Sequence, residues 1–455
     1  MKPSRYNFLI DNNGNYVLYN AFSDQLTMLL SDLYELYVEN IDNIENLKAK
    51  HPQFYDYLVS FGFVVDDDCD EISTVVDRWK DYDENSTDFT LIINPTLKCN
   101  MNCWYCYESK KDVVGSMTDA VKRKIMRLIS NLLSENSRFR HLCLSFFGGE
   151  PLLAFDNVVK DIVEYTRKLC KSSDKSFSIH FTSNGYLLND RIIDFFSDVD
   201  TTFQIALEGN ELVHNSVKST KIGDNAYAVT IANIKKALSR GVNVAVRLNF
   251  TSETLPFFQD VICDFEDMSN EMKNLVNFNF QRIWQDNNGK SDYDKIVNDV
   301  RLLEDKFRNA GLFIVPFTSN PFERCYADRE NTATVNFDGF VFKCTARDFN
   351  KENCDGHLCE DGNIEWNDVH KRRLLHVYCN DTCRMCKIFP LCHGGCSQTK
   401  LESRCTEGNC LKGYDETMKT KIVYDRIHDI LTTNNYYIRR NRAGHQFGVH
   451  DNYRQ

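Results

Sequence analysis

Three cysteines in one short loop have the spacing most suited to chemistry in this chain: Cys99, Cys103 and Cys106. Three and then two residues separate them, and they follow a strand-like apolar run at residues 91–95. Three thiolates can hold three irons of a 4Fe–4S cubane and leave the fourth iron open to another ligand. Zinc is the alternative, but it requires a fourth ligand, and the next cysteine, Cys143, lies far downstream. The spacing therefore predicts an iron–sulfur cluster with one exchangeable position.

Glycine-rich and polar segments follow the next predicted strands, at the edge where ligands of a βα barrel bind. Two glycines let the backbone approach a ligand closely, and a carboxylate beside them can accept a hydrogen bond from an ammonium group. An ordinary turn is the alternative at each place. The residues are Gly148, Gly149, Glu150 and Pro151 after the second strand, and Ser183 and Asn184 after the third.

Charged residues come at or after the ends of the fourth and fifth predicted strands. Glu208 ends the fourth strand, Lys218 follows it, and Arg247 lies near the end of the fifth. A guanidinium group matches a carboxylate in a bidentate arrangement, so Arg247 is a candidate ligand for an acidic group. A solvated surface arginine is the alternative.

Eleven of the eighteen cysteines crowd the segment between residues 325 and 410. Disulfide frameworks are typical of small secreted domains, whereas this chain is large and its first residues carry no signal-peptide core. The crowding therefore indicates metal binding. The cysteines are Cys325, Cys344, Cys354, Cys359, Cys379, Cys383, Cys386, Cys392, Cys396, Cys405 and Cys410.

Length and charge limit the remaining possibilities. The chain has 455 residues, enough for two or three domains, and a formal net charge of −11. An acidic balance argues against a general nucleic-acid surface, and no apolar run reaches the length of a membrane span. We therefore expect a cytoplasmic protein with no nucleic-acid and no membrane partner.

Strands and helices alternate between residues 89 and 315, which is typical of a parallel sheet with crossover helices. A helix is expected from Thr118, a capping residue, to about Leu133. The pattern predicts an α/β fold, with six strands in an open, partial βα barrel. Those strands are expected at residues 91–95, 141–147, 179–183, 203–207, 242–248 and 276–280.

The chain before the barrel predicts a small α/β module over residues 1–75. Residues 8–19 predict a hairpin, and apolar periodicity predicts a helix through Leu26, Leu29, Leu30, Leu33 and Leu36. A second helix is expected at about 44–61, followed by a short strand, so that the module is winged-helix-like. The remaining boundaries are an acidic linker at 76–88, the barrel at 89–315, the cysteine-rich domain at 316–412, and a helix and tail at 413–455.

The cysteine loop resembles the signature of the radical S-adenosylmethionine (SAM) enzymes, in which the open iron chelates SAM. The resemblance implies that Tyr105 packs over the cluster and that residues 148–151 hold the methionine amine of SAM. Ser183 and Asn184 then correspond to ribose contacts, and Arg247 to a partner of the SAM carboxylate. Glu208 and Lys218 join the same cofactor site, and at Lys218 relatives often carry arginine.

The cysteine-rich segment resembles the SPASM domain, which carries two auxiliary iron–sulfur clusters. In that pattern one cluster takes Cys325, Cys344 and Cys396, and the other takes Cys383, Cys386, Cys392 and a trailing cysteine, Cys410 rather than Cys405. A pair of zinc sites is the alternative. The first cluster lacks the fourth ligand that relatives place before Cys325. Either Cys354, Cys359 or Cys379 supplies it, or that iron is open to substrate.

The front module resembles the precursor-peptide recognition element of peptide-modifying radical SAM enzymes. A packing extension is the alternative. Together these resemblances imply a maturase that uses SAM and three 4Fe–4S clusters, with a reductant such as flavodoxin or ferredoxin. It would crosslink a ribosomally made precursor peptide, with a thioether favoured and a carbon–carbon or carbon–oxygen bond as the alternatives.

Two other functions remain open. One is an anaerobic sulfatase-maturating enzyme, but such relatives usually carry Asp directly after the second SPASM cysteine, where this chain has Thr345. The other is a non-catalytic SAM-binding or peptide-binding protein. The complete loop at Cys99, Cys103 and Cys106 argues against it.

Overall fold

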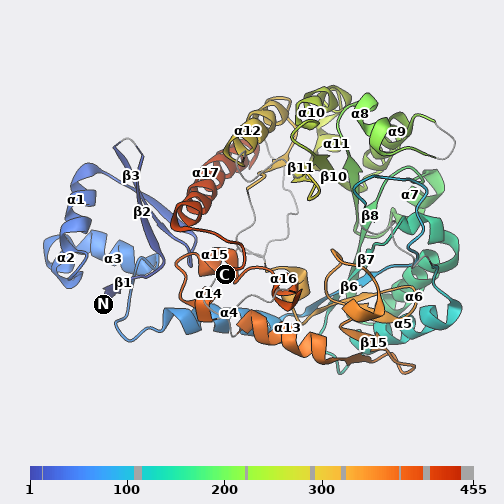
Figure 1. Ribbon diagram of the computed structural model, residues 1–455, viewed down its shortest axis with the longest axis horizontal. Helices are drawn as coiled ribbons and strands as arrows, with labels where there is room; N and C mark the ends of the chain where they lie inside the picture. The colour runs from blue at the N-terminus through green and yellow to red at the C-terminus, as the bar shows by residue number, and fades with distance from the viewer. Residues whose placement is uncertain are drawn as a thin grey trace. The chain divides into compact units, whose positions relative to one another are not determined.

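The computed structural model describes residues 1–12, 14–106, 115–220, 224–286, 293–318, 324–378, 381–402 and 410–441 (Figure 1). The chain divides into two compact units, which we name the barrel unit and the terminal unit. Among the described residues, the barrel unit comprises Ser86–Phe317 and Arg329–Lys371. The terminal unit comprises Met1–Asn85, Thr318–Asp328 and Arg372–His445.

An eleven-stranded sheet forms the centre of the barrel unit, in the order β12-β11-β10-β9-β8-β7-β6-β13-β14-β15-β16. Strands β6 to β12 run parallel, β13 also pairs parallel with β6, and the last three pairings are antiparallel. The strands are β6 (Asp88–Ile93), β7 (His141–Phe146), β8 (Ser176–Ser183), β9 (Thr201–Leu207), β10 (Asn243–Phe250), β11 (Val276–Arg282), β12 (Ile314–Val315), β13 (Thr332–Val335), β14 (Phe340–Phe342), β15 (Gly356–Leu358) and β16 (Ile364–Trp366).

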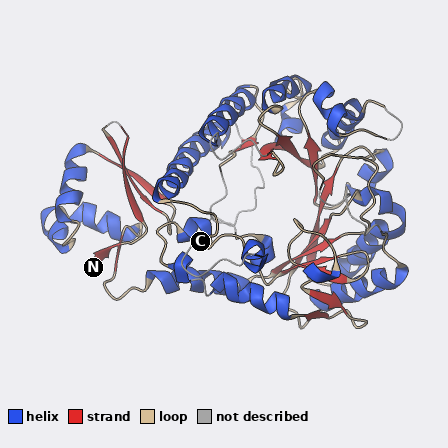
Figure 2. Ribbon diagram, in the orientation of Figure 1, coloured by secondary structure: helices blue, strands red, loops and turns tan. Residues whose placement is uncertain are grey.

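Helices cover one side of this curved sheet (Figure 2). Side chains alternate along each strand, so Phe203, Ile205 and Leu207 of β9 are fully buried in the core. The opposite face of the same strand carries smaller and polar residues. The helices are α5 (Asp119–Leu132), α6 (Lys160–Lys171), α7 (Asp190–Phe196), α8 (Glu211–Val217), α9 (Ala226–Ser239), α10 (Phe258–Val261), α11 (Asn270–Asn274) and α12 (Tyr293–Asn309).

The six predicted barrel strands are confirmed as β6 to β11, in the predicted chain order. The predicted helix cap is also present, because the Thr118 side chain accepts a hydrogen bond from the Val121 amide at the start of α5. The sheet is larger than predicted, since β12 and the segment from β13 to β16 extend it at both ends.

The terminal unit begins with an antiparallel three-stranded sheet, in the order β2-β3-β4, and three helices. Its elements are β1 (Lys2–Pro3), β2 (Asn7–Asn12), β3 (Asn15–Asn20), β4 (Gln25–Leu29), α1 (Ser31–Asn40), α2 (Glu45–Lys50), α3 (Pro52–Ser60) and β5 (Val64–Val65). The predicted hairpin is confirmed as β2 and β3. The resemblance of this module to a winged helix stays a prediction.

Two expectations for the module were wrong in their detail. Leu26 and Leu29 lie in strand β4 rather than in a helix, because β4 pairs in register with β3 and Leu26 faces Tyr19. The helix itself begins at Ser31. The second predicted helix is broken into α2 and α3 at Pro52, which lacks an amide proton and disfavours a helical conformation in the residue before it.

The predicted linker at residues 76–88 is largely helical, since α4 spans Glu71–Asn85. Val75, Val76 and Trp79 recur at helical spacing and are buried in one core with residues from both ends of the chain. Apolar burial therefore outweighs the acidic composition that suggested a linker. Five further helices follow β16 along the chain. They are α13 (Asp368–Tyr378), α14 (Asp381–Arg384), α15 (Phe389–Cys392), α16 (Ser397–Glu402) and α17 (Glu416–Asn441).

Candidate active site

The cysteines Cys99, Cys103 and Cys106 lie together in the loop that follows β6. The Cys106 amide donates to the Cys103 carbonyl at 3.1 Å, which closes a tight turn between the last two thiols. Burial raises the pKa of Cys99 to about 11 and that of Cys103 to about 12, and the neighbouring thiols add to both increases. Such thiols ionise when a metal replaces the proton, so this donor set fits a 4Fe–4S cluster with one open iron.

The predicted glycine loop packs directly on the cysteine loop. The Gly149 amide donates to the Thr96 carbonyl at 3.1 Å, and the Glu150 amide donates to the Lys98 carbonyl at 2.9 Å. A Cβ on Gly148 would lie 2.5 Å from the Thr96 oxygen, and one on Gly149 would lie 2.3 Å from the Lys98 oxygen. Gly148 also has a φ of +106°, which side-chain-bearing residues rarely adopt. Both glycines are therefore required for the two loops to meet.

Glu150 is fully buried and binds groups of its own chain. Its carboxylate accepts from the Ser183 hydroxyl at 2.9 Å, from the Asn184 amide at 2.8 Å and from the Leu152 amide at 3.0 Å. Burial raises the pKa of this carboxyl, and these donors oppose that increase. Where the sequence suggested an acceptor for an ammonium group, the structure shows a carboxylate that joins the loops after β7 and β8. Pro151 begins the short helix that follows.

The loop after β8 in turn reaches the cysteines. The Asn184 side chain donates to the Asn100 side-chain oxygen at 2.8 Å and lies 3.8 Å from the Cys99 sulfur. The structure thus brings together the first three predicted segments around one thiol. Asn100 was missed as a contributor, although its place inside the cysteine loop was an available signal.

A buried polar group completes the site at the ends of β9 and β10. The Tyr105 hydroxyl donates to Glu208 Oε1 at 2.5 Å, and the Lys218 ammonium lies 3.4 Å from the same oxygen. The Asn249 amide donates to the Tyr105 hydroxyl at 3.0 Å. Glu208 and Lys218 are only 1% and 3% exposed, so this is a buried ion pair. The predicted residues Tyr105, Glu208 and Lys218 therefore meet in one site.

Glu208 also offers an acceptor to a ligand. Within the part of the chain that the structure describes, Glu208 Oε2 is buried and has no hydrogen-bond partner. A buried carboxylate oxygen without a donor is costly unless a bound molecule satisfies it. Sequence reasoning did not select Asn249, although its position two residues after Arg247 places both on one face of β10.

Arg247 lies on that face of β10, and its Nη2 makes a long contact to Gln281 Oε1 at 3.4 Å. Its Nε is buried and has no hydrogen-bond partner among the described residues. A guanidinium group in this state suits a carboxylate ligand, in keeping with the predicted role.

Strand β8 adds a half-buried histidine on the side of the sheet opposite Phe181. His180 Nδ1 lies 3.2 Å from the Ser145 hydroxyl on β7, and burial lowers the pKa of His180 to about 4. The ring is therefore neutral at physiological pH. Sequence reasoning missed His180, although the alternation of polar and apolar residues in this strand was a signal for a polar face.

A second group of thiols lies in the terminal unit. Burial is the main cause that raises the pKa of Cys383, to about 11, and the thiols of Cys392, Cys410 and Cys386 add to it in that order. The Cys386 amide donates to the Cys383 carbonyl at 3.0 Å, which holds these two cysteines in one turn. Cys383, Cys386 and Cys392 also pack against an apolar core that contains Ile388, Phe389 and Leu391.

The turn after α15 places these thiols. Gly394 and Gly395 have φ values of +78° and +84°, and His393 also has a positive φ of 56°. The reversal brings Gly394 against the Cys383 side chain and Gly395 against Leu411, next to Cys410. Four thiolates in this arrangement fit a closed 4Fe–4S cluster.

The remaining predicted ligands are distributed between the two units. Cys325 and Cys396 belong to the terminal unit, and Cys344 follows β14 in the barrel unit, so their joint ligation stays a prediction. Cys379 and Cys405 lie outside the described residues. Cys354 is 8% exposed, in an apolar cluster with Leu97, Phe342 and Phe349.

Comparisons with known proteins agree with this geometry. Residues 93–271 match the model of the Radical SAM superfamily. The cysteine-type anaerobic sulfatase-maturating enzyme of Clostridium perfringens is 22% identical over 351 residues, covering 68% of this chain and 89% of that protein. The structure of native anSMEcpe with bound AdoMet matches at 20% identity with a TM-score of 0.57, over 76% of this chain and 99% of that one.

Another solved structure extends over more of the chain. Streptococcus suis SuiB bound to the precursor peptide SuiA matches at 13% identity with a TM-score of 0.51, over 89% of this chain and 98% of that chain. The fold and the superfamily match together support SAM and a 4Fe–4S cluster as cofactors. None of the helices described here combines the length and apolar character that crossing a membrane requires.

Proposed function

We propose that this radical SAM enzyme, as its domain at residues 93–271 identifies it, is a maturase that crosslinks a ribosomally made precursor peptide. Cys99, Cys103 and Cys106 would hold a cluster with SAM on its open iron. One electron from an external reductant such as flavodoxin or ferredoxin would break the S–C5′ bond of SAM, releasing methionine and a 5′-deoxyadenosyl radical that takes a hydrogen atom from the substrate. The chain's own residues orient the cofactor and exclude water. Glu208 Oε2 offers an acceptor, and Tyr105 closes the site by its bond to Glu208.

The observation that carries the proposal is the edge strand of the N-terminal sheet. Strand β4 pairs only with β3 among the described strands, so its other side can accept an extended peptide as an added strand. Met28 in β4 is 60% exposed, and Leu30 directly after it is 72% exposed. Residues 16–19, in the second arm of the predicted hairpin, lie in the central strand β3 and are paired on both sides, so they offer no free edge.

Substitution at this edge tests peptide recognition. Met28→Ser with Leu30→Ser should weaken binding of a precursor peptide, once one is found among the neighbouring open reading frames, by about tenfold or more, because two apolar contacts are lost. SAM cleavage without peptide should not change. Leu375→Ser, at a leucine that is 61% exposed elsewhere in the terminal unit, is the matched control. Equal peptide affinity in the double variant and the wild type would contradict the proposed role.

Removal of the whole module is a less suitable test. Tyr6 and Tyr19 of the module belong to the same apolar core as Phe389 and Val423, and the second thiol group packs against that core. A deletion would therefore expose the cysteines as well as remove the sheet edge, so the point substitutions are preferred.

The missing cluster ligand favours a thioether product. A cluster on Cys325, Cys344 and Cys396 has one position without a protein thiolate, and a substrate cysteine could occupy it, deprotonated by the metal. Its thiolate sulfur would then be positioned to bond the substrate carbon that has lost a hydrogen atom, and the surplus electron would pass to the auxiliary cluster. Cys354 is the main rival as fourth ligand, since its neighbour Asp355 accepts from the Lys343 amide beside Cys344.

Spectroscopy separates these alternatives. In the Cys354→Ala variant, the auxiliary clusters should persist, and a cysteine-containing precursor should change their EPR spectrum. The same precursor with that cysteine replaced by alanine is the control. Loss of an auxiliary cluster in Cys354→Ala, or a spectrum unchanged by the peptide, would rule out the open position and make carbon–carbon and carbon–oxygen crosslinks equally plausible products.

A second candidate function is sulfatase maturation, which the similarity to the Clostridium perfringens enzyme favours. The products distinguish the two. A crosslink forms no aldehyde, whereas formylglycine carries an aldehyde that reacts with a hydrazide probe. Formation of such an aldehyde on a peptide that spans a sulfatase's target Cys or Ser would replace the crosslinking proposal.

A further inference from the structure

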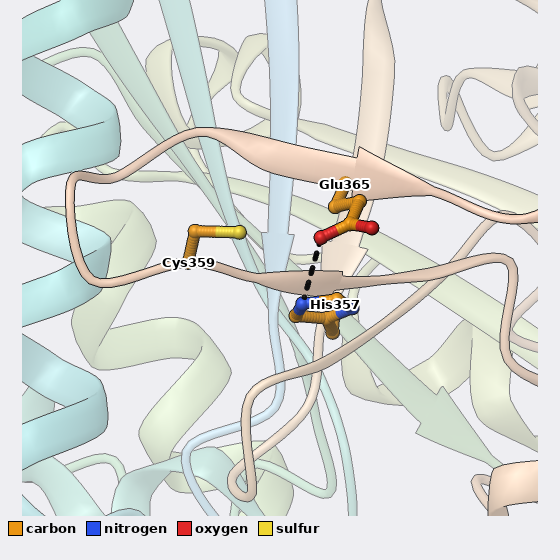
Figure 3. A group of neighbouring side chains, drawn as sticks. All are labelled: His357, Cys359 and Glu365. Atoms are coloured by element: carbon orange, nitrogen blue, oxygen red, sulfur yellow. Dashed lines mark ion pairs between the residues drawn. The ribbon is translucent and has the colours of Figure 1, made fainter.

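The hairpin formed by β15 and β16 gathers three metal-binding side chains on one face (Figure 3). His357 lies in β15, and Cys359 follows two residues later, so both side chains project from the same side of the strand. Glu365 in β16 pairs directly with His357 in the antiparallel register. The Cys359 amide donates to the Asn363 carbonyl at 2.9 Å, which continues the pairing beyond β15.

The ligand atoms of these residues are close enough for one ion. One atom from each residue lies within 4.8 Å of the other two, and His357 Nε2 is 3.3 Å from a Glu365 oxygen. Ligand atoms of a tetrahedral zinc ion lie roughly 3.3–3.8 Å apart, given metal–ligand bonds of about 2.0–2.3 Å. Small rotations of exposed side chains therefore suffice to bring all three onto a metal.

We propose that His357, Cys359 and Glu365 form a zinc-type site, separate from the iron–sulfur clusters. A thiolate, an imidazole and a carboxylate together suit zinc, and three protein ligands leave one position for water or another ligand. A bound ion would join the last two strands of the eleven-stranded sheet, where β16 forms the edge. It would also engage Cys359, and so remove one candidate for the missing auxiliary-cluster ligand.

The neighbouring acid supplies a contrast. Glu360 follows Cys359 directly, yet its carboxylate pairs with Lys124 on α5 at 2.7 Å. Glu360 therefore belongs to a helix contact and not to the metal-binding face. His357 and Glu365 are 53% and 71% exposed, so substitutions there should leave the core intact.

The test uses the full chain with its iron loaded under anaerobic conditions, so that cluster thiols do not bind the probe. After equilibration with buffered Zn²⁺, wild type should retain about one more zinc per chain than Cys359→Ser, His357→Asn or Glu365→Gln. Iron content should be equal in all of them. Zinc K-edge absorption should show one sulfur at about 2.3 Å in the wild type. Glu360→Gln and Cys263→Ser, an exposed cysteine elsewhere, are the matched controls and should bind zinc as the wild type does.

Three results would overturn the site. These are equal zinc in the wild type and the three variants, a zinc spectrum with only nitrogen and oxygen ligands, or a loss of about four irons in Cys359→Ser, which would make Cys359 a cluster ligand. Zinc should also raise the melting temperature of the wild type but not that of Cys359→Ser, because a ligand that binds only the folded state stabilises it.

Discussion

The two thiol groups of this protein lie in contrasting surroundings. The loop after β6 shares its site with hydrogen-bonding and charged side chains. Glu150, Asn184, Glu208 and Asn249 lie at or after successive strand ends, and Lys218 lies at the end of α8. The group in the terminal unit instead packs against an apolar core that includes Ile388, Phe389 and Leu391. Burial raises the pKa of Cys99 in the first group and that of Cys383 in the second, so burial alone does not distinguish the two groups.

This difference indicates different tasks. A cluster that shares an iron with a small molecule needs oriented donors and acceptors around the open position, and Glu208 Oε2 and Arg247 Nε supply polar atoms that lack partners in the described chain. A cluster with four thiolates of its own would need no such donors and acceptors. We therefore expect SAM chemistry at the first group and electron transfer or structural support at the second.

The largest difference between the two thiol groups should appear when each group is removed separately. Replacing Cys99, Cys103 and Cys106 by Ala should abolish SAM cleavage and remove about four of roughly twelve irons, because the group would no longer hold a cluster. Replacing Cys383, Cys386 and Cys392 by Ala should also remove about four irons while SAM cleavage without peptide persists. The measurements are 5′-deoxyadenosine formation and iron content.

Either of two outcomes would contradict the assignment. Cleavage retained in the first variant would refute the SAM site. Cleavage abolished in the second, with the barrel unit still folded by circular dichroism, would show that both groups act in the same step.

The buried pair of Glu208 and Lys218 beside the first thiol group should contribute to the stability of the fold. Glu208→Gln leaves the lysine ammonium buried without its carboxylate, which should lower the free energy of unfolding by about 3–5 kcal/mol. The more exposed pair of Lys122 and Asp161 is the control, and Lys122→Met should cost at most about 1 kcal/mol. Urea denaturation of each variant and of the wild type measures both changes in the free energy of unfolding. Equal losses would mean that burial of the pair adds nothing to stability.

His180 should make the stability of the protein depend on pH, with a smaller effect than that of the Glu208–Lys218 pair. Burial lowers its pKa to about 4 from an ordinary value of 6.5, so in that interval the unfolded chain binds a proton that the folded chain does not. Stability should therefore fall as the pH decreases through this window, by about 2 kcal/mol between about pH 7 and pH 5. His180→Asn should remove that part of the slope in urea denaturation at the two pH values. The same slope in both proteins would exclude His180 as its source.

Much of the barrel followed from local pattern. The six strands, the capped helix at Thr118 and the place of the cysteine loop were predictable, because strand alternation, capping and close ligand spacing are properties of short segments. Cys99, Cys103 and Cys106 lie within eight residues, so the loop alone brings them together.

Which residues far apart in the sequence come into contact could be learned only from the tertiary structure. Strand β4 could be recognised only by its pairing with β3, and α4 only by the core that buries Trp79. The contact of Glu150 with the loop after β8 depends on parallel register, as does the meeting of Tyr105, Glu208 and Asn249. Contacts of this kind depend on strand order and on burial across the fold, so the spacing of residues within a short segment does not predict them.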